Sequence, residues 1–234
     1  MSFMIEEGRV DLSNIRGMIA HSAGTIEPDD AAYLFATGKS ELDFRNILAL
    51  YLHKNLQPGQ ITIREWKRHD LAILNEKLEP FVIIEGKVWG HTDATIPTKL
   101  NTAKDSIKAA LEGDLQKLMD AKEKHPDVQT FATTFLFSVE FNEFSLDETA
   151  EKLVKYAPLH KRGIKDQGSL EALVEKGREK LQGLMGKYGE TMWIPTWQGE
   201  FMGARITSEV CILEPNMAKV RKLVKPTQKK EGKR

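Results

Sequence analysis

Residues 81–89, FVIIEGKVW, constrain the fold more than any other part of the chain. Their β-branched and aromatic residues indicate a strand, and apolar residues on both of its faces indicate a buried position in a sheet. Glu85 and Lys87 interrupt this run on one face, because alternate residues of a strand point to the same side. A charge in apolar surroundings is costly unless it is paired, and such charges are often functional. The segment therefore predicts a central strand that carries a site.

The rest of the chain alternates between helical and strand patterns. In chain order we expect a helix at 28–37, a helix from 40 to the Pro58-Gly59 turn, strands at 61–66, 70–74 and 81–89, a helix at 98–124, a strand at 130–141, helices at about 147–157 and 169–188, and a hairpin at 191–213. Tight links between the first three strands predict an antiparallel meander. The helix before the fourth strand predicts a parallel crossover.

These elements predict an α/β fold, a mixed sheet flanked by helices with a C-terminal helical and β-hairpin elaboration. We expect residues 1–39 to form an N-terminal helical extension and residues 40–145 to form the α/β core. Residues 146–214 would complete the same domain with helices and the hairpin. Residues 215–234 would form a basic, flexible tail.

Composition limits the class of protein. A chain of 234 residues can bury a substantial core, and a single cysteine, Cys211, excludes an internal disulfide and suits a reducing compartment. The acidic, mixed N-terminus is unlike a signal peptide, and no apolar run reaches the roughly 20 residues of a membrane span. We therefore expect a cytoplasmic protein without a membrane partner.

Charge is unevenly distributed although the formal net charge is zero. Residues 215–234 contain eight basic residues and one acid, a charge of +7 that leaves −7 on the remainder. A cationic arm that includes Lys225, Lys229 and Lys230 would gain affinity for nucleic acid through counterion release. The alternative is a tail that serves only solubility.

Asp70 is expected to join Glu85 and Lys87. It begins the strand at 70–74, and antiparallel pairing with 81–89 would bring its carboxylate beside that of Glu85. Two converging carboxylates suit Mg²⁺, which prefers few protein oxygens and takes the rest from water and phosphate. The Lys87 ammonium could then orient an attacking water or stabilise phosphate charge.

The order of these motifs resembles the PD-(D/E)xK nuclease superfamily, which has the restriction-endonuclease-like fold. Asp70 would stand for the family's aspartate and Glu85-Gly86-Lys87 for its (D/E)xK. Glu41 matches the additional acid that many members carry on the helix before the sheet. GDLQKL at 113–118 is similar to an Asp-Leu-x-Lys-Leu stretch of some branches. The resemblance covers roughly residues 40–141 and departs from the motif at His69, where the family has proline.

The resemblance implies a nuclease-like core and Mg²⁺-dependent hydrolysis of phosphodiester bonds, most simply in DNA, with Mn²⁺ as a substitute. Asp70, Glu85 and Glu41 would be metal ligands, and Lys87 would complete the catalytic set. A homodimer is one arrangement found among double-strand cutters of this kind. Two alternatives stay open: a nucleic-acid-binding or protein-interaction module without catalysis, and a structural protein in which Glu85 and Lys87 form a strand ion pair.

Other polar and aromatic residues near the motif are weaker candidates. His69, Trp89 and His91 flank the expected site and could contact nucleic acid, although hydrogen-bonded or core roles are the commoner fate of such residues. Asp114 and Lys117 are expected to be exposed helix residues. No Walker A loop, dinucleotide-binding glycine turn, zinc-ligand spacing or serine nucleophile elbow occurs in the sequence.

Overall fold

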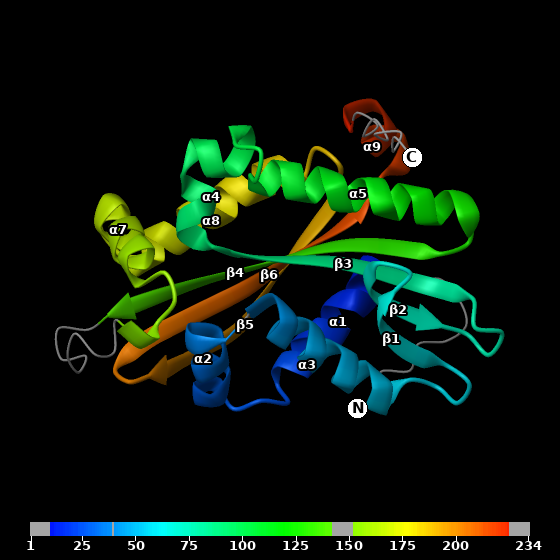
Figure 1. Ribbon diagram of the computed structural model, residues 1–234, viewed down its shortest axis with the longest axis horizontal. Helices are drawn as coiled ribbons and strands as arrows, with labels where there is room; N and C mark the ends of the chain where they lie inside the picture. Colours follow the sequence, from blue (N-terminus) through cyan, green and yellow to red (C-terminus); the bar gives the residue numbers. More distant parts are fainter. Residues whose placement is uncertain (1–9, 39, 142–151, 225–234) are drawn as a thin grey trace, which may run out of the picture.

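A six-stranded sheet forms the centre of the protein (Figure 1). The computed structural model describes residues 10–38, 40–141 and 152–224. The strands are β1 (Ile61–Trp66), β2 (His69–Leu74), β3 (Pro80–Gly90), β4 (Gln129–Phe141), β5 (Gly189–Phe201) and β6 (Ala204–Pro215). They lie in the order β1-β2-β3-β4-β6-β5. The β3–β4 pair is parallel, and the other neighbours are antiparallel.

The strand predictions are confirmed. The three strands expected in succession form the antiparallel meander β1–β2–β3, and a helical crossover leads to parallel β4. The expected hairpin forms β5 and β6, and β6 pairs with β4, so the hairpin extends the same sheet. The protein is therefore a mixed α/β structure with a mixed sheet flanked by helices.

Helices cover both faces of the sheet. They are α1 (Leu12–Ala23), α2 (Pro28–Thr37), α3 (Ser40–Asn55), α4 (His91–Thr95), α5 (Ile107–Lys124), α7 (Ala157–Gln167), α8 (Leu170–Met185) and α9 (Met217–Leu223), with a π-helical turn η1 (Thr98–Thr102). In Figure 1, α1, α2 and α3 lie below the sheet, whereas α4, α5, α8 and α9 lie above it.

Two separate hydrophobic cores result from this arrangement. On β3, Val82 and Ile84 belong to the core beneath α1–α3, whereas Ile83 belongs to the core beneath α5 and α8. The first core contains packed aromatic rings, among them Phe35 and Phe135 with centroids 4.8 Å apart. Because both faces are covered, the central strands are apolar on both sides.

The helix predicted at 98–124 is wrong at its start. Thr98–Thr102 form the turn η1, Ala103 is extended, and α5 begins only at Ile107. The Ser106 hydroxyl accepts a hydrogen bond from the Ala109 N–H and so caps the helix. Apolar residues continue at helical spacing across the break, which concealed the boundary.

Four of the described helices, α1, α4, α7 and α9, were not predicted. α1 lies in a segment interpreted only as acidic and mixed, yet Asp11 and Asn14 form a reciprocal capping box at its start. α7 begins at the end of the predicted helix at 147–157, of which residues 147–151 lie outside the described residues and residues 152–153 are helical. Within the described residues the prediction therefore ends its helix near Ala157, where α7 begins and continues to Gln167.

The basic segment, expected to be flexible from residue 215, instead begins with a helix. Asn216 caps α9, Val220 is fully buried, and Arg221 forms an ion pair of 3.0 Å with Glu123 of α5. The tail lysines Lys225, Lys229 and Lys230 lie outside the described residues.

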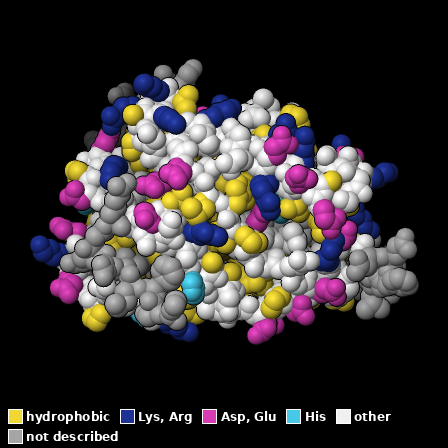
Figure 2. Space-filling model, turned by 180° about the vertical axis from the view of Figure 1, so that it is seen from behind, with side chains coloured by type: hydrophobic (Ala, Val, Ile, Leu, Met, Phe, Trp, Pro, Cys, Tyr) yellow, Lys and Arg dark blue, Asp and Glu magenta, His cyan; other side chains and the backbone are white. Residues whose placement is uncertain are grey.

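Within the described ranges, none of the helices is long and apolar enough to cross a bilayer. Figure 2 shows the face opposite to that of Figure 1, where acidic and basic side chains are interspersed and hydrophobic side chains gather near the centre.

Candidate functional site

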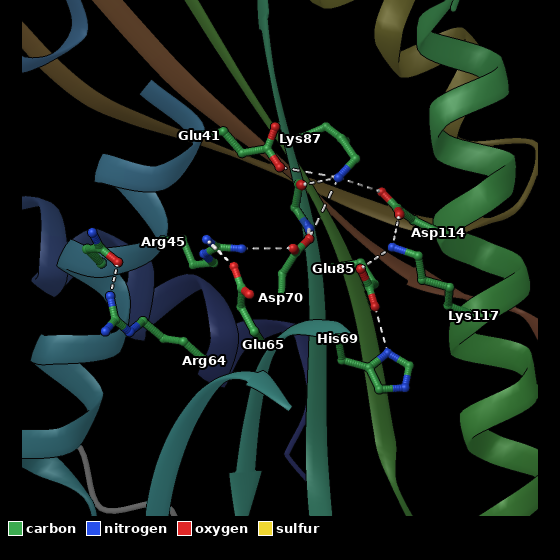
Figure 3. A network of polar contacts seen from close by, with 12 residues as sticks. Glu41, Arg45, Arg64, Glu65, His69, Asp70, Glu85, Lys87, Asp114 and Lys117 are labelled. Carbon is green, nitrogen blue, oxygen red and sulfur yellow. Dashed lines mark hydrogen bonds and ion pairs between the residues drawn. The ribbon is translucent and has the colours of Figure 1, made fainter. Parts of the chain in front are cut away.

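The register of the sheet places Asp70 beside Glu85 (Figure 3). Leu71 of β2 pairs with Ile84 of β3 in antiparallel order, so the neighbouring residues Asp70 and Glu85 lie opposite each other. Their carboxyl groups are close enough for each to alter the pKa of the other. The expected convergence of these two acids is confirmed.

Asp70 is held by donors from two neighbouring elements. The Gly86 N–H donates to its Oδ2 over 2.9 Å, and the Arg45 guanidinium of α3 donates to its Oδ1 over 3.1 Å. Burial alone would raise the pKa of Asp70, but the Gly86 hydrogen bond and the Lys87 charge outweigh burial and lower it. Asp70 is therefore a fixed anion at neutral pH.

Glu85 is the most buried acid of the site, with none of its surface exposed. Its Oε1 lies 2.6 Å from the His69 Nδ1, and its Oε2 accepts a hydrogen bond of 3.0 Å from the Lys117 Nζ. Burial raises the pKa of Glu85, and the His69 hydrogen bond only partly opposes this effect. The protein thus keeps a carboxyl group at the sheet centre that is costly to ionise without a cation nearby.

Lys87 lies between carboxylates from three elements. Its Nζ donates to the Gly86 carbonyl over 3.0 Å and to the Glu41 Oε1 of α3 over 3.3 Å. It also lies 3.6 Å from the Asp114 Oδ2 and 3.8 Å from the Asp70 Oδ2. Burial would lower the pKa of Lys87, but these carboxylates, Asp114 most strongly, raise it. Lys87 therefore stays an ammonium ion.

Asp114 and Lys117, expected to be exposed helix residues, belong to the site. The Asp114 side chain is only 6 % exposed, and the Lys117 Nζ lies 2.8 Å from its Oδ1. Burial lowers the pKa of Lys117, but Asp114 and Glu85 together raise it well above its usual value. The sequence contained a signal, because Asp114 lies at a position of the buried stripe formed by Leu111 and Leu115.

The histidines and the tryptophan near the motif have different roles. His69 contacts Glu85, as described, and stacks on Trp66. His91 is fully buried and hydrogen-bonded to Ser138 and Glu209, so a nucleic-acid contact is wrong for it and the ordinary structural role is confirmed. Trp89 is half-buried and lines a groove beside the site.

The cluster carries an excess of negative charge. Four carboxylates face two ammonium groups, while Arg45 of α3 also pairs with Glu65 and so adds no net charge. The four carboxylates are Glu41, Asp70, Glu85 and Asp114, and the two ammonium groups are Lys87 and Lys117. The site can therefore accept a further cation or a cation-bearing ligand without accumulating positive charge.

A divalent cation fits this donor set in part. In the described part of the chain, His, Cys, Asp and Glu side chains form no group of three or more able to hold a metal ion. Mg²⁺ needs only one or two protein carboxylates, because water and phosphate complete its shell. Asp70 and Glu85 supply such a pair, whereas Glu41 contacts Lys87 and does not join them.

No protein-family model matches the chain, and neither a curated protein nor a solved structure does.

Proposed function

We propose that the chain is a metal-dependent nuclease that hydrolyses phosphodiester bonds, in DNA, on a restriction-endonuclease-like core of α3, β1–β4 and α5. One observation carries the proposal: Asp70 and Glu85 lie opposite each other on paired central strands, with Lys87 two residues beyond Glu85. The same motif residues that resemble the PD-(D/E)xK superfamily are thus neighbours in space. Their negative excess gives the cluster a reason to bind a cation.

Asp70 and Glu85 would hold the Mg²⁺ ion, for which Mn²⁺ could substitute. When bound, the ion supplies Lewis-acid polarisation of the phosphate and a more acidic bound water. Phosphodiester hydrolysis needs a large lowering of its barrier, about 8–23 kcal/mol in typical enzymes, which supports a metal rather than lysine alone.

Lys87 is the residue we assign to the water and the scissile phosphate. Its ammonium is held at 3.3 Å by Glu41, and its raised pKa keeps it protonated. A fixed ammonium can donate to a water or stabilise the negative charge that develops on a phosphate. Glu41 acts here as a positioning residue for Lys87.

Asp114 and Lys117 support the acids from α5. Lys117 bridges Asp114 and Glu85 and offsets part of their charge while the cation is absent. On cation binding, the Lys117 ammonium would be the group best placed to move away, because its side chain is 42 % exposed.

Cleavage by the full chain tests the proposal. Single- and double-stranded DNA and RNA are incubated with Mg²⁺ or Mn²⁺, and Lys87→Ala is compared with Lys108→Ala, a partly exposed lysine on α5 that contacts none of the site residues in the described contacts. We expect Lys87→Ala to lower the cleavage rate by at least about 100-fold, the usual cost of losing one electrostatic stabiliser, and Lys108→Ala to cleave normally. Calorimetry should show Mn²⁺ uptake that Asp70→Asn abolishes.

Absence of cleavage with both metals, together with Mn²⁺ uptake unaffected by Asp70→Asn, would overturn the proposal. Nucleic-acid binding without cleavage or metal uptake would instead support the non-catalytic binding module.

Light scattering of the same samples tests the homodimer. A reducing, cytoplasmic setting suits Cys211, which is a free and fully buried thiol.

A further inference from the structure

A groove of about 780 Å³ adjoins the candidate site. It shares Glu41 and Arg45 with the site and continues along the end of β3, past Trp89, to Tyr156 and His160. α2 and α3 contribute one part of its lining, and α4, η1 and the start of α7 contribute another. Its volume falls within the roughly 300–1,000 Å³ of pockets that enclose an organic ligand.

The lining combines aromatic and cationic side chains. Trp89 is half-buried in the groove, whereas Tyr156 is 68 % exposed and available to a ligand. Lys99 and Lys155 add ammonium groups to a lining that also contains the paired Arg45 and the carboxylates of Glu41, Glu65 and Asp93. Aromatic faces on which bases stack, beside cations that follow the backbone, are the combination by which proteins hold single-stranded nucleic acid.

Buried polar atoms on two side chains of the lining lack hydrogen-bond partners among the described residues. Within the described part of the chain, the two ring nitrogens of His160 have no hydrogen-bond partner. The Trp89 Nε1 has none either. His160 is only 1 % exposed, and burial lowers its pKa to about 4, so it is a neutral donor and acceptor. Because a buried unsatisfied polar group costs free energy, these groups point to a ligand that supplies partners.

We propose that the groove holds a single-stranded stretch of the nucleic-acid substrate, with an unstacked base between Trp89 and Tyr156 and His160 facing its polar edge. The backbone of this stretch continues past Arg45 to Lys87. In a duplex, each base is already stacked and paired, so its face is not free to stack on Trp89 and Tyr156. This inference rests on the proposed function and specifies its substrate as single-stranded at the site.

Fluorescence anisotropy with labelled 12-nucleotide oligomers tests the groove without relying on cleavage. The full chain is titrated with single-stranded DNA, single-stranded RNA and duplex DNA, once in EDTA and once with Ca²⁺. The variants are Tyr156→Ala and His160→Phe. Matched controls are Tyr33→Ala, an exposed tyrosine outside the groove lining, and Lys108→Ala.

We expect a single strand to bind more tightly than the duplex. Tyr156→Ala should raise its Kd about 5- to 100-fold, the range for loss of one base stack, while both controls bind as the parent does. His160→Phe should weaken binding yet leave the free protein at least as stable, because it removes two unsatisfied buried nitrogens. Comparison of the Kd values for single-stranded DNA and single-stranded RNA shows whether the groove prefers deoxyribose or ribose.

Equal affinity for duplex and single strand, or affinities unchanged by Tyr156→Ala, would overturn the groove assignment. So would failure to bind any oligomer under both conditions. Tight, Tyr156-dependent binding by a protein that cleaves nothing would uphold the groove while overturning the nuclease proposal.

Discussion

Lys117 determines much of the charge balance at the level of single residues, because it contacts two buried carboxylates. We predict that Lys117→Met lowers the free energy of unfolding at pH 7.5 by about 1–3 kcal/mol, since Glu85 and Asp114 lose a shared cation. The lower part of this range allows for solvent screening, because Lys117 is partly exposed. Urea denaturation measures the change.

The control for this variant is Lys108→Met on the same helix, because Lys108 is equally exposed but pairs with the partly exposed Glu112 instead of with buried carboxylates. It should change the stability by no more than about 0.5 kcal/mol. Adding Asp114→Asn to Lys117→Met should restore part of the lost stability, because it lowers the negative excess of the cluster, in which, of the described cations, only Lys87 still faces Asp114. Equal effects of the two lysine variants would show that Lys117 has no special role.

His160 should make stability depend on pH. Burial, reinforced by the nearby His91, lowers its pKa from 6.5 to about 4 in the folded protein. Between these values the unfolded chain binds more protons, so stability present above pH 6.5 is lost as the pH falls. We predict a loss of roughly 2 kcal/mol between pH 7.5 and 5.0 from this residue.

Urea denaturation of the parent and of His160→Phe at these two pH values isolates the effect. The variant should lose less stability on acidification than the parent, by about the amount assigned to His160. If both lose the same amount, the imidazole is not held neutral by burial.

The site residues differ in how far the sequence could reveal them. Alternation along a strand is enough to place Glu85 and Lys87 on one face, and strand pairing places Asp70 beside them. Asp114 was misjudged as exposed because its charge was given more weight than its position in the apolar stripe. The contact between Lys117 and Glu85 depends on where α5 crosses the sheet. No local sequence pattern specifies that position.

At the scale of elements, α7 is held against α4 by a close approach at Gly163. A Cβ at this position would lie 2.0 Å from the Thr92 Oγ1, which is closer than atoms can come. We predict that Gly163→Ala lowers the free energy of unfolding by about 1–3 kcal/mol, because α7 must shift away. Gly183→Ala on α8 is the matched control.

At Gly183 a Cβ would meet nothing within 4 Å, so alanine should stabilise the helix by up to about 1 kcal/mol. Thermal denaturation compares the two variants. Because α7 carries His160, Gly163→Ala should also weaken oligonucleotide binding in the groove, and Gly183→Ala should not. If Gly183→Ala were less stable than Gly163→Ala, α7 would not be constrained by its contact with α4.

The elements themselves were predictable where local signals agreed. The central strands have β-branched residues and clear turns, so β1–β4 and the final hairpin were located correctly. The start of α5 was missed because apolar spacing continues through η1, although Ser106 is a typical cap. α9 was missed because its basic surface outweighed the single buried Val220, whose burial depends on packing against distant segments.

At the scale of the whole molecule, β4 joins the part that resembles a nuclease core to the rest of the chain. On one side it pairs with β3, and on the other it pairs with β6 along Ala132 to Phe141. Both faces of β4 are covered by helices, since Phe135 belongs to one core and Leu136 to the other. The site acids are therefore held by strands whose order depends on the C-terminal hairpin.

We predict that a fragment of residues 40–141 does not fold on its own. Without β6, a long apolar edge of β4 is exposed, and such an edge favours aggregation. Without α1 and α2, the aromatic core around Phe135 loses Phe35. The fragment should bind a hydrophobic dye and unfold without a cooperative transition in urea, whereas the full chain should show one. A cooperative transition in the fragment would instead make residues 40–141 an independent domain, with the hairpin as an addition to a core already complete.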